Sequence, residues 1–96
     1  MPDLNVRRSP LFNQKAKELL GPDRFENFVV GLEWVLRRNA ELGQRVRKSK
    51  LFVWPVYPGD GYVYITYYSV AENEVTLRSM IKRPAPVSPQ IFDLED

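Results

Sequence analysis

The stretch from Tyr62 to Lys82 limits most strongly what this chain can fold into, because it holds two alternating runs separated by a short turn. The first run, YVYITYYSV, is rich in Tyr, Val, Ile and Thr, which suit the pleated, half-buried surface of a strand. The second run, VTLRSMIK, follows the turn segment AENE. A segment of this length can join two antiparallel strands, so the stretch is predicted to form a β-hairpin.

Each run of the hairpin has two faces, because successive side chains of a strand point to opposite sides of a sheet. One face is apolar, suits a core, and is predicted to hold Val63, Ile65, Tyr67, Val75, Leu77 and Ile81. The other face carries tyrosines beside cations and is predicted to hold Tyr62, Tyr64, Thr66, Tyr68, Thr76, Arg78, Met80 and Lys82. We expect the rest of the fold to cover the first face and to leave the second open for a partner.

Two amphipathic helices are predicted ahead of the hairpin. Ser9 and Pro10 are typical of a helix start, with Ser as N-cap and Pro where its missing N–H costs nothing, and Gly21 ends that helix. Asp23, with Glu26 three residues later, resembles a capping box that opens the second helix. The second helix has an apolar stripe at helical spacing: Phe25, Phe28, Val29, Leu32, Val35 and Leu36. The pattern predicts an antiparallel helical hairpin.

Two shorter strands complete the predicted architecture. Leu51–Trp54 precedes the hairpin, and because Pro55 and Pro58 have no N–H to donate, its later half is predicted to lie at a sheet edge or to leave the sheet. Residues 4–8 are a weaker strand candidate that adds to the sheet. The predicted fold class is α+β: an N-terminal strand and a helical hairpin packed on one face of an antiparallel β-sheet meander. Residues 1–83 form one domain, and residues 84–96 form a Pro-rich acidic tail that is disordered or held by a partner.

The composition excludes several classes of protein and site. The 96 residues, 44% of them hydrophobic and 27% charged, suffice for one modest core of an ordinary soluble globule. The chain has no cysteine, which excludes disulfides and thiolate metal sites, and no histidine, which removes the commonest general base and metal ligand. No apolar run approaches the roughly 20 residues that span a bilayer, and no signal-peptide segment begins the sequence. We expect a cytoplasmic protein without a metal or cofactor.

Charge is distributed unevenly along the chain. Residues 1–50 hold 11 Lys and Arg against 6 Asp and Glu, whereas residues 51–96 hold 3 against 6. Four of the cations lie within six residues: Arg45, Arg47, Lys48 and Lys50. A cluster of this density favours a polyanion or an acidic partner, and a solvated loop is the alternative.

The order of these elements and two strings resemble the RelE/ParE family of toxins from bacterial and archaeal type II toxin–antitoxin operons. LEWVLRRNAELGQRV, residues 32–46, is similar to the end of that family's second helix and the turn after it. YYSVAENEVTLRSM, residues 67–80, is similar to its central hairpin, and the likeness covers about residues 5–83. The resemblance implies a small toxin that a cognate antitoxin holds inactive. The RelE-like branch cleaves messenger RNA, usually on the ribosome, and the ParE-like branch poisons DNA gyrase.

A RelE-like function implies a metal-independent mRNA endonuclease in which the RNA 2′-hydroxyl attacks the phosphodiester. The hydroxyl must lose a proton, the phosphorane must be stabilised, and the departing 5′-oxygen needs a proton. The family uses Lys, Arg and Tyr for such steps, and a lysine of lowered pKa and an arginine clamp suit the first two. The catalytic candidates on matching elements are Lys48, Lys50, Arg78 and Tyr68. The candidates for RNA contact are Arg45, Arg47, Tyr64, Lys82 and Arg83.

One departure from the family leaves other hypotheses open. The family's RNases usually carry a tyrosine after the last strand, and this chain has none beyond Tyr68. The alternative is a non-catalytic RelE/ParE-fold binding module, either a ParE-like DNA gyrase inhibitor or a degenerate toxin that only binds its antitoxin. An unrelated small α+β protein with the same pattern is the third reading. A homodimer is compatible with each of them.

Overall fold

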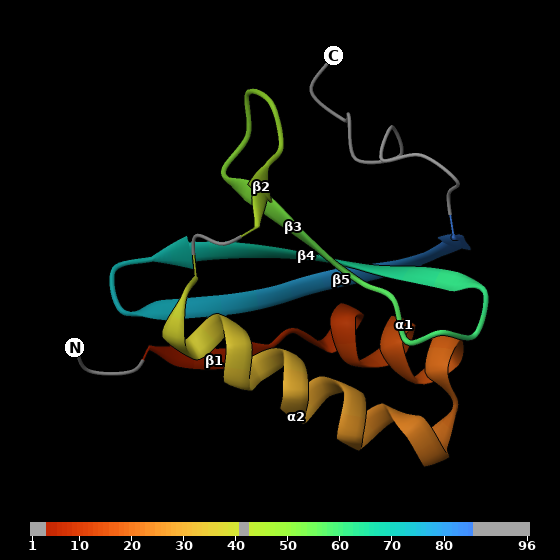
Figure 1. Ribbon diagram of the computed structural model, residues 1–96. Coiled ribbons are helices and arrows are strands. Elements are labelled where there is room, and N and C mark those ends of the chain that lie inside the picture. The colour runs from red at the N-terminus through yellow and green to blue at the C-terminus, as the bar shows by residue number, and fades with distance from the viewer. Residues whose placement is uncertain (1–3, 41–42, 86–96) are drawn as a thin grey trace.

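The computed structural model of the chain, which describes residues 4–40 and 43–85, places two helices against one face of a five-stranded sheet (Figure 1). In chain order the elements are β1 (Asn5–Arg8), α1 (Pro10–Leu20), α2 (Pro22–Arg38), β2 (Gln44–Arg45), β3 (Leu51–Val56), β4 (Tyr62–Ala71) and β5 (Glu74–Pro84). The strands lie in the order β1-β5-β4-β3-β2. The predicted α+β architecture is confirmed. The tail is predicted for residues 84–96: Pro84 is the last residue of β5, and residues 86–96 lie outside the described part.

The predicted hairpin forms the centre of the sheet. β4 and β5 pair antiparallel from Ala71 opposite Glu74 to Tyr62 opposite Pro84. β1 adds to the sheet as predicted, but it runs parallel to β5, so the sheet is mixed. β2 pairs only with Phe52 and Val53 of β3, both of which precede Pro55. Pro55 therefore has β4 on one side and no described strand on the other, so its missing N–H removes no hydrogen bond from the sheet on that side.

Local sequence signals set the helix ends. Ser9 Oγ accepts a hydrogen bond from Phe12 N at 3.0 Å, and Gly21, with φ of 82°, ends α1 by donating its N–H to Lys17 O. The predicted ends of α1 are confirmed. The capping box predicted for the second helix is wrong, because α2 begins at Pro22 and its N-cap is Gly21 without a side-chain cap. Gly21 is thus both the C-cap of α1 and the N-cap of α2, and it is the only residue between the two helices.

The apolar stripe predicted for the second helix faces the sheet. Its buried residues in α2 are Phe25, Val29, Leu32 and Leu36. They form one core with buried residues of α1 and of the sheet, which are Phe12, Ala16, Leu20, Tyr64, Tyr68, Val75, Leu77 and Met80. The stripe therefore joins the helical layer to the sheet. Val30 and Trp34 lie off the stripe and are 54% and 57% exposed.

The predicted faces of β4 are exchanged in the structure. Tyr64 and Tyr68, predicted on the open face, are buried beneath the helices, whereas Val63 and Ile65 belong to a second, smaller buried cluster with Val53. The prediction assumed unbroken alternation along both strands. β4 itself alternates without a break, but a register shift opposite Tyr67 and Tyr68 changes the phase of β5. Val75 and Leu77 therefore lie under the helices as predicted, whereas Val63 and Ile65, predicted to share their face, lie on the other.

The same shift leaves β5 with one residue more than β4. Tyr67 pairs with Ser79 and Tyr68 pairs with Leu77, so Arg78 is the extra residue of a β-bulge. Leu77 and Met80, three apart, both enter the core under the helices. The predictions for Met80 on the open face and Ile81 under the helices are consequently wrong, and Arg78 stays on the exposed side as predicted.

Thr66 carries a buried hydroxyl in the middle of β4 whose effect on stability can be tested. Its side chain is fully buried, and its Oγ1 has no hydrogen-bond partner among the described residues. Replacement Thr66→Val keeps the shape and removes a buried polar atom, so we expect the free energy of unfolding to rise by about 1 kcal/mol. Urea denaturation at an unchanged m-value measures the change. A lower stability of Thr66→Val than of the wild type would show that the hydroxyl has a partner.

Candidate functional site

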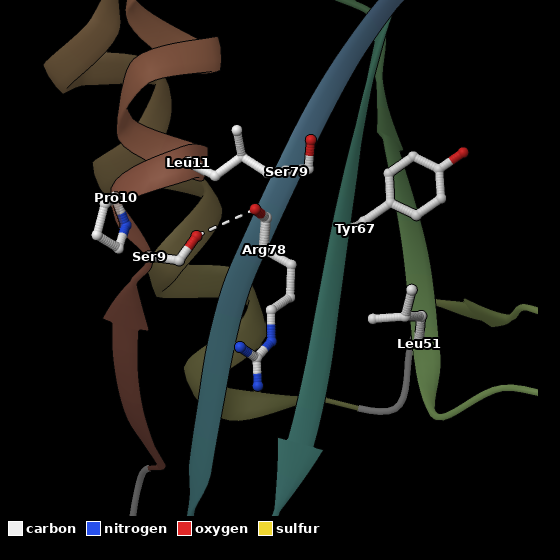
Figure 2. A pocket seen from close by; sticks show the side chains of 7 residues that line it. All are labelled: Ser9, Pro10, Leu11, Leu51, Tyr67, Arg78 and Ser79. Carbon is white, nitrogen blue, oxygen red and sulfur yellow. Dashed lines mark hydrogen bonds between the residues drawn. The ribbon is translucent and has the colours of Figure 1, made fainter.

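A shallow groove of about 490 Å³ lies on the face of the sheet that the helices leave uncovered. Figure 2 shows the start of α1 on one side, β5 in the middle and side chains of β4 and β3 on the other side. The lining residues are Ser9, Pro10, Leu11, Leu51, Tyr67, Arg78 and Ser79. The groove is mostly apolar, with one cation and the polar ends of Tyr67 and the serines.

Arg78 is the exposed cation of this groove. Its Nε donates a hydrogen bond to Ser69 Oγ at 3.0 Å, and its backbone carbonyl accepts one from Ser9 Oγ at 3.0 Å. The first bond orients the guanidinium and uses one of its five donors. A guanidinium fixed at Nε can still bind a carboxylate or a phosphate through its terminal nitrogens. Tyr67, half-buried on the neighbouring strand, adds an aromatic ring to the lining of the same groove.

A second depression, of about 280 Å³, adjoins the groove and links Arg78 to Arg7 and Arg8 of β1. Arg8 is held by Glu33 in a bidentate pair at 2.8 and 3.2 Å, and this pairing raises the pKa of Arg8 above its ordinary value. Arg8 thus ties β1 to α2. Arg7 is exposed and lies 3.5 Å from Glu74. Sequence reasoning missed Arg7, because only the parallel pairing of β1 with β5 brings it near Arg78.

Tyr68 does not reach the groove. Its hydroxyl donates to Ala40 O at 2.7 Å and accepts from Gly43 N at 3.0 Å, and its ring stacks on Phe52 at 5.4 Å between centroids. The predicted placement of Tyr68 beside Arg78 is wrong, because the hydroxyl ties the connection after α2 to the sheet from the helix side. In its place the register of β4 brings Tyr67, predicted for the core, to the groove.

Tyr64 also lies on the helix side, at the opposite end of β4, which corrects its predicted place on the open face. Its hydroxyl donates to Asp60 Oδ2 at 2.7 Å, and Arg24 reaches the same oxygen at 3.1 Å. The Lys82 ammonium lies 4.1 Å from the Tyr62 ring centroid and 5.7 Å from that of Tyr64. Tyr64 and Lys82 therefore belong to this polar corner and not to the groove.

Hydrogen bonds in that corner, first from Tyr64 and then from the Tyr62 backbone and Arg24, lower the pKa of Asp60 below its ordinary value. An unfolded Asp titrates near a pKa of about 4. The carboxylate's contribution to stability is fully present above that value and is lost as the pH falls through the lower folded pKa.

We therefore expect the wild type to lose more stability than Asp60→Asn when the pH falls from about 5 to about 2. Thermal unfolding across this range measures the difference. Parallel losses in the two proteins would contradict the expectation.

The basic segment of the sequence begins with Arg45, the last residue of β2, and continues through the turn between β2 and β3. Arg45 Nε donates to Ser49 O at 3.0 Å, and Lys48 has a φ of 59°. Arg45 and Lys50 line a separate pocket on the side that carries the helices. The structure thus places Lys50 and Arg78 on opposite faces of the sheet. The residues of this segment, and Arg83 near the end of β5, are exposed: Arg45, Arg47, Lys48, Lys50 and Arg83.

Comparison of the chain with protein-family models, with curated proteins and with solved structures finds no significant match in any of the three. Within residues 4–40 and 43–85, no helix is both long enough and apolar enough to cross a membrane. The same residues contain no group of three or more acidic side chains arranged to hold a metal ion.

Proposed function

We propose that the chain is the toxin component of a type II toxin–antitoxin system and acts by binding its target through the open face of the sheet. The observation that supports this most directly is the groove with the exposed Arg78 and the ring of Tyr67, opposite to the helices. An oriented guanidinium and an aromatic ring in one groove suit a partner that offers both an anionic group and a flat or apolar one.

Binding is favoured over cleavage because the proposed catalytic groups do not meet. Lys50 lies on the other side of the sheet from Arg78, and the hydroxyls of Tyr64 and Tyr68 are engaged with Asp60 and with the backbone. Arginine cannot be deprotonated in a protein, so Arg78 can bind a phosphate but cannot serve as a general base. The groove thus has a group for the charge of a phosphorane and none among its lining residues for removing the 2′-proton.

A RelE-like mRNA endonuclease is the second candidate, and the presence of Arg78 and Tyr67 in one groove favours it. The arginine would bind the scissile phosphate, and the tyrosine would stack on a base or supply a proton. In this reading the proton acceptor has to come from the target, because the lining of the groove supplies none.

Induced expression of the wild type, Arg78→Ala and Arg37→Ala separates these functions. Arg37 is an exposed arginine of α2 and controls for loss of a positive charge. We expect growth arrest by the wild type and Arg37→Ala, and its loss in Arg78→Ala, because truncating an interface arginine of this kind costs about 2 kcal/mol or more of binding. Primer extension should show intact transcripts.

The other results of the same experiment are equally informative. New transcript ends that appear with the wild type and disappear in Arg78→Ala would show that the protein cleaves RNA, and would support the endonuclease instead of the binding function. An SOS response with intact transcripts would identify gyrase as the target. A wild type that leaves growth unaffected, at a level of folded protein equal to that of the variants, would overturn the toxin proposal.

A further inference from the structure

A pocket of about 360 Å³ lies at the other end of the sheet from the Tyr64 corner, on the side that carries the helices. The β2–β3 turn, β3, β4 and the β4–β5 turn contribute its lining, which consists of Arg45, Lys50, Phe52, Val70 and Glu72. A volume of this size is within the range of sites for small organic ligands. None of the roles considered above for the open face uses this pocket.

Phe52 gives the pocket a fixed aromatic surface. One side of its ring stacks on Tyr68, with an interplanar angle of 18°, and Tyr68 is itself held by hydrogen bonds to Ala40 and Gly43. Phe52 is half-buried and also lines the pocket. A ring held in this way can stack on a ligand at little cost in conformational entropy, and a nucleobase is a flat ligand that stacks on aromatic side chains.

Two cations flank the aromatic surface. Arg45 pairs with Phe52 across the strands, so their side chains share a face of the sheet. The hydrogen bond from Arg45 Nε to Ser49 O orients the guanidinium. Lys50, exposed, lines the same pocket two residues before Phe52. A guanidinium and an ammonium in the same pocket as an aromatic surface suit a phosphate group attached to the stacked ligand.

Glu72 introduces an acceptor into this otherwise basic pocket. Its φ of 52° belongs to the tight turn that joins β4 to β5, where one or both central residues have a positive φ. The ion pairs of the described residues do not include Glu72. A carboxylate only accepts hydrogen bonds, and it pairs with the exocyclic amino group of a base such as cytosine.

We propose that this pocket binds a nucleotide whose base carries an exocyclic amino group, either free or as one residue of single-stranded RNA. The base stacks on Phe52, its amino group donates to Glu72, and its phosphate lies between Arg45 and Lys50. This site is on the opposite face of the sheet from Arg78. The inference does not rest on the toxin proposal, because it follows from the lining of the second pocket alone.

Binding of labelled oligocytidine and oligouridine of about eight residues to the purified full chain, measured by fluorescence anisotropy, tests the inference. Cytosine and uracil differ at the amino position that Glu72 addresses. We expect oligocytidine to bind about tenfold more tightly, and Glu72→Gln to reduce this preference to about twofold, because an amide both donates and accepts. Cytidine monophosphate as competitor distinguishes the free nucleotide from the strand.

Matched charge variants locate the phosphate. Lys50→Gln should weaken binding of both oligonucleotides and lower the slope of log affinity against log salt by about 1, whereas Lys15→Gln, an exposed lysine of α1, should leave the slope unchanged. Circular dichroism confirms that each variant is folded. If cytidine monophosphate competes with the oligonucleotide, the ligand of the site is the free nucleotide. If the oligonucleotide binds and cytidine monophosphate does not compete, the ligand is a residue of a strand.

Three results would overturn the inference. One is equal affinity for the two oligonucleotides with no effect of Glu72→Gln. Another is equal weakening by Lys50→Gln and Lys15→Gln, which would show diffuse attraction. The third is binding that Arg78→Ala abolishes and Lys50→Gln leaves intact, which would place the RNA in the open groove.

Discussion

Replacement of Tyr68 by phenylalanine is expected to lower the free energy of unfolding by about 2–4 kcal/mol. The ring remains in place and only the hydroxyl is lost. That hydroxyl is buried, donates to Ala40 O at 2.7 Å and accepts from Gly43 N at 3.0 Å. Its removal leaves a buried carbonyl and a buried N–H without this partner, and each unsatisfied group costs about 1–3 kcal/mol.

Tyr67→Phe is the matched control, since it removes the same atom from a half-buried tyrosine next along β4. We expect its effect on stability to stay within about 0.5 kcal/mol, as is usual for substitutions away from buried networks. Urea denaturation of the two variants gives the comparison. Equal stabilities of Tyr68→Phe and Tyr67→Phe would show that Tyr68 does not hold the connection after α2.

The elements that the sequence predicted correctly are those set by neighbouring residues. The Ser9 cap, the Gly21 terminator and the short β4–β5 turn each depend on contacts within a few positions. The apolar stripe of α2 is likewise readable, because its period belongs to the helix itself. The wrong capping box shows the limit of such signals, since a Gly-Pro pair two residues earlier already begins the helix.

The faces of the hairpin were not readable from alternation, because the phase of β5 depends on a bulge. One extra residue at Arg78 allows Leu77 and Met80 to enter the same core. Nothing in the string VTLRSMIK marks that position. Tyrosine adds to the ambiguity, since its ring suits a core while its hydroxyl needs a partner. The Tyr64 hydroxyl donates a hydrogen bond to Asp60, and the Tyr68 hydroxyl donates one to the backbone carbonyl of Ala40 after α2.

The sites depend on contacts between distant parts of the chain. The groove joins Arg78 to the start of α1, and Arg7 approaches only through the parallel β1–β5 pairing. The basic turn was found from its charge, but the sequence could not show that Lys50 and Arg78 occupy opposite faces. The tyrosines of the helix side serve as supports, and the aromatic side chains that line the two proposed sites are Tyr67 on one face and Phe52 on the other.

Leu36→Ala should be among the most destabilising single changes, with a loss of about 3 kcal/mol in the free energy of unfolding. Leu36 is fully buried between α2 and the sheet, so truncation removes apolar contacts and leaves a cavity in the main core. Trp34, two residues earlier, is 57% exposed and carries Arg38 over its ring at 4.4 Å. Trp34→Ala should therefore cost less than about 1 kcal/mol in the monomer.

Urea denaturation at several protein concentrations compares the two variants. The expected result is a large loss for Leu36→Ala and a small one for Trp34→Ala, at every concentration. Equal losses would mean that the outer face of α2 is covered in solution. If the unfolding midpoint of the wild type also rose with protein concentration and that of Trp34→Ala did not, the cover would be a second copy of the chain, because association stabilises only the folded state that forms it.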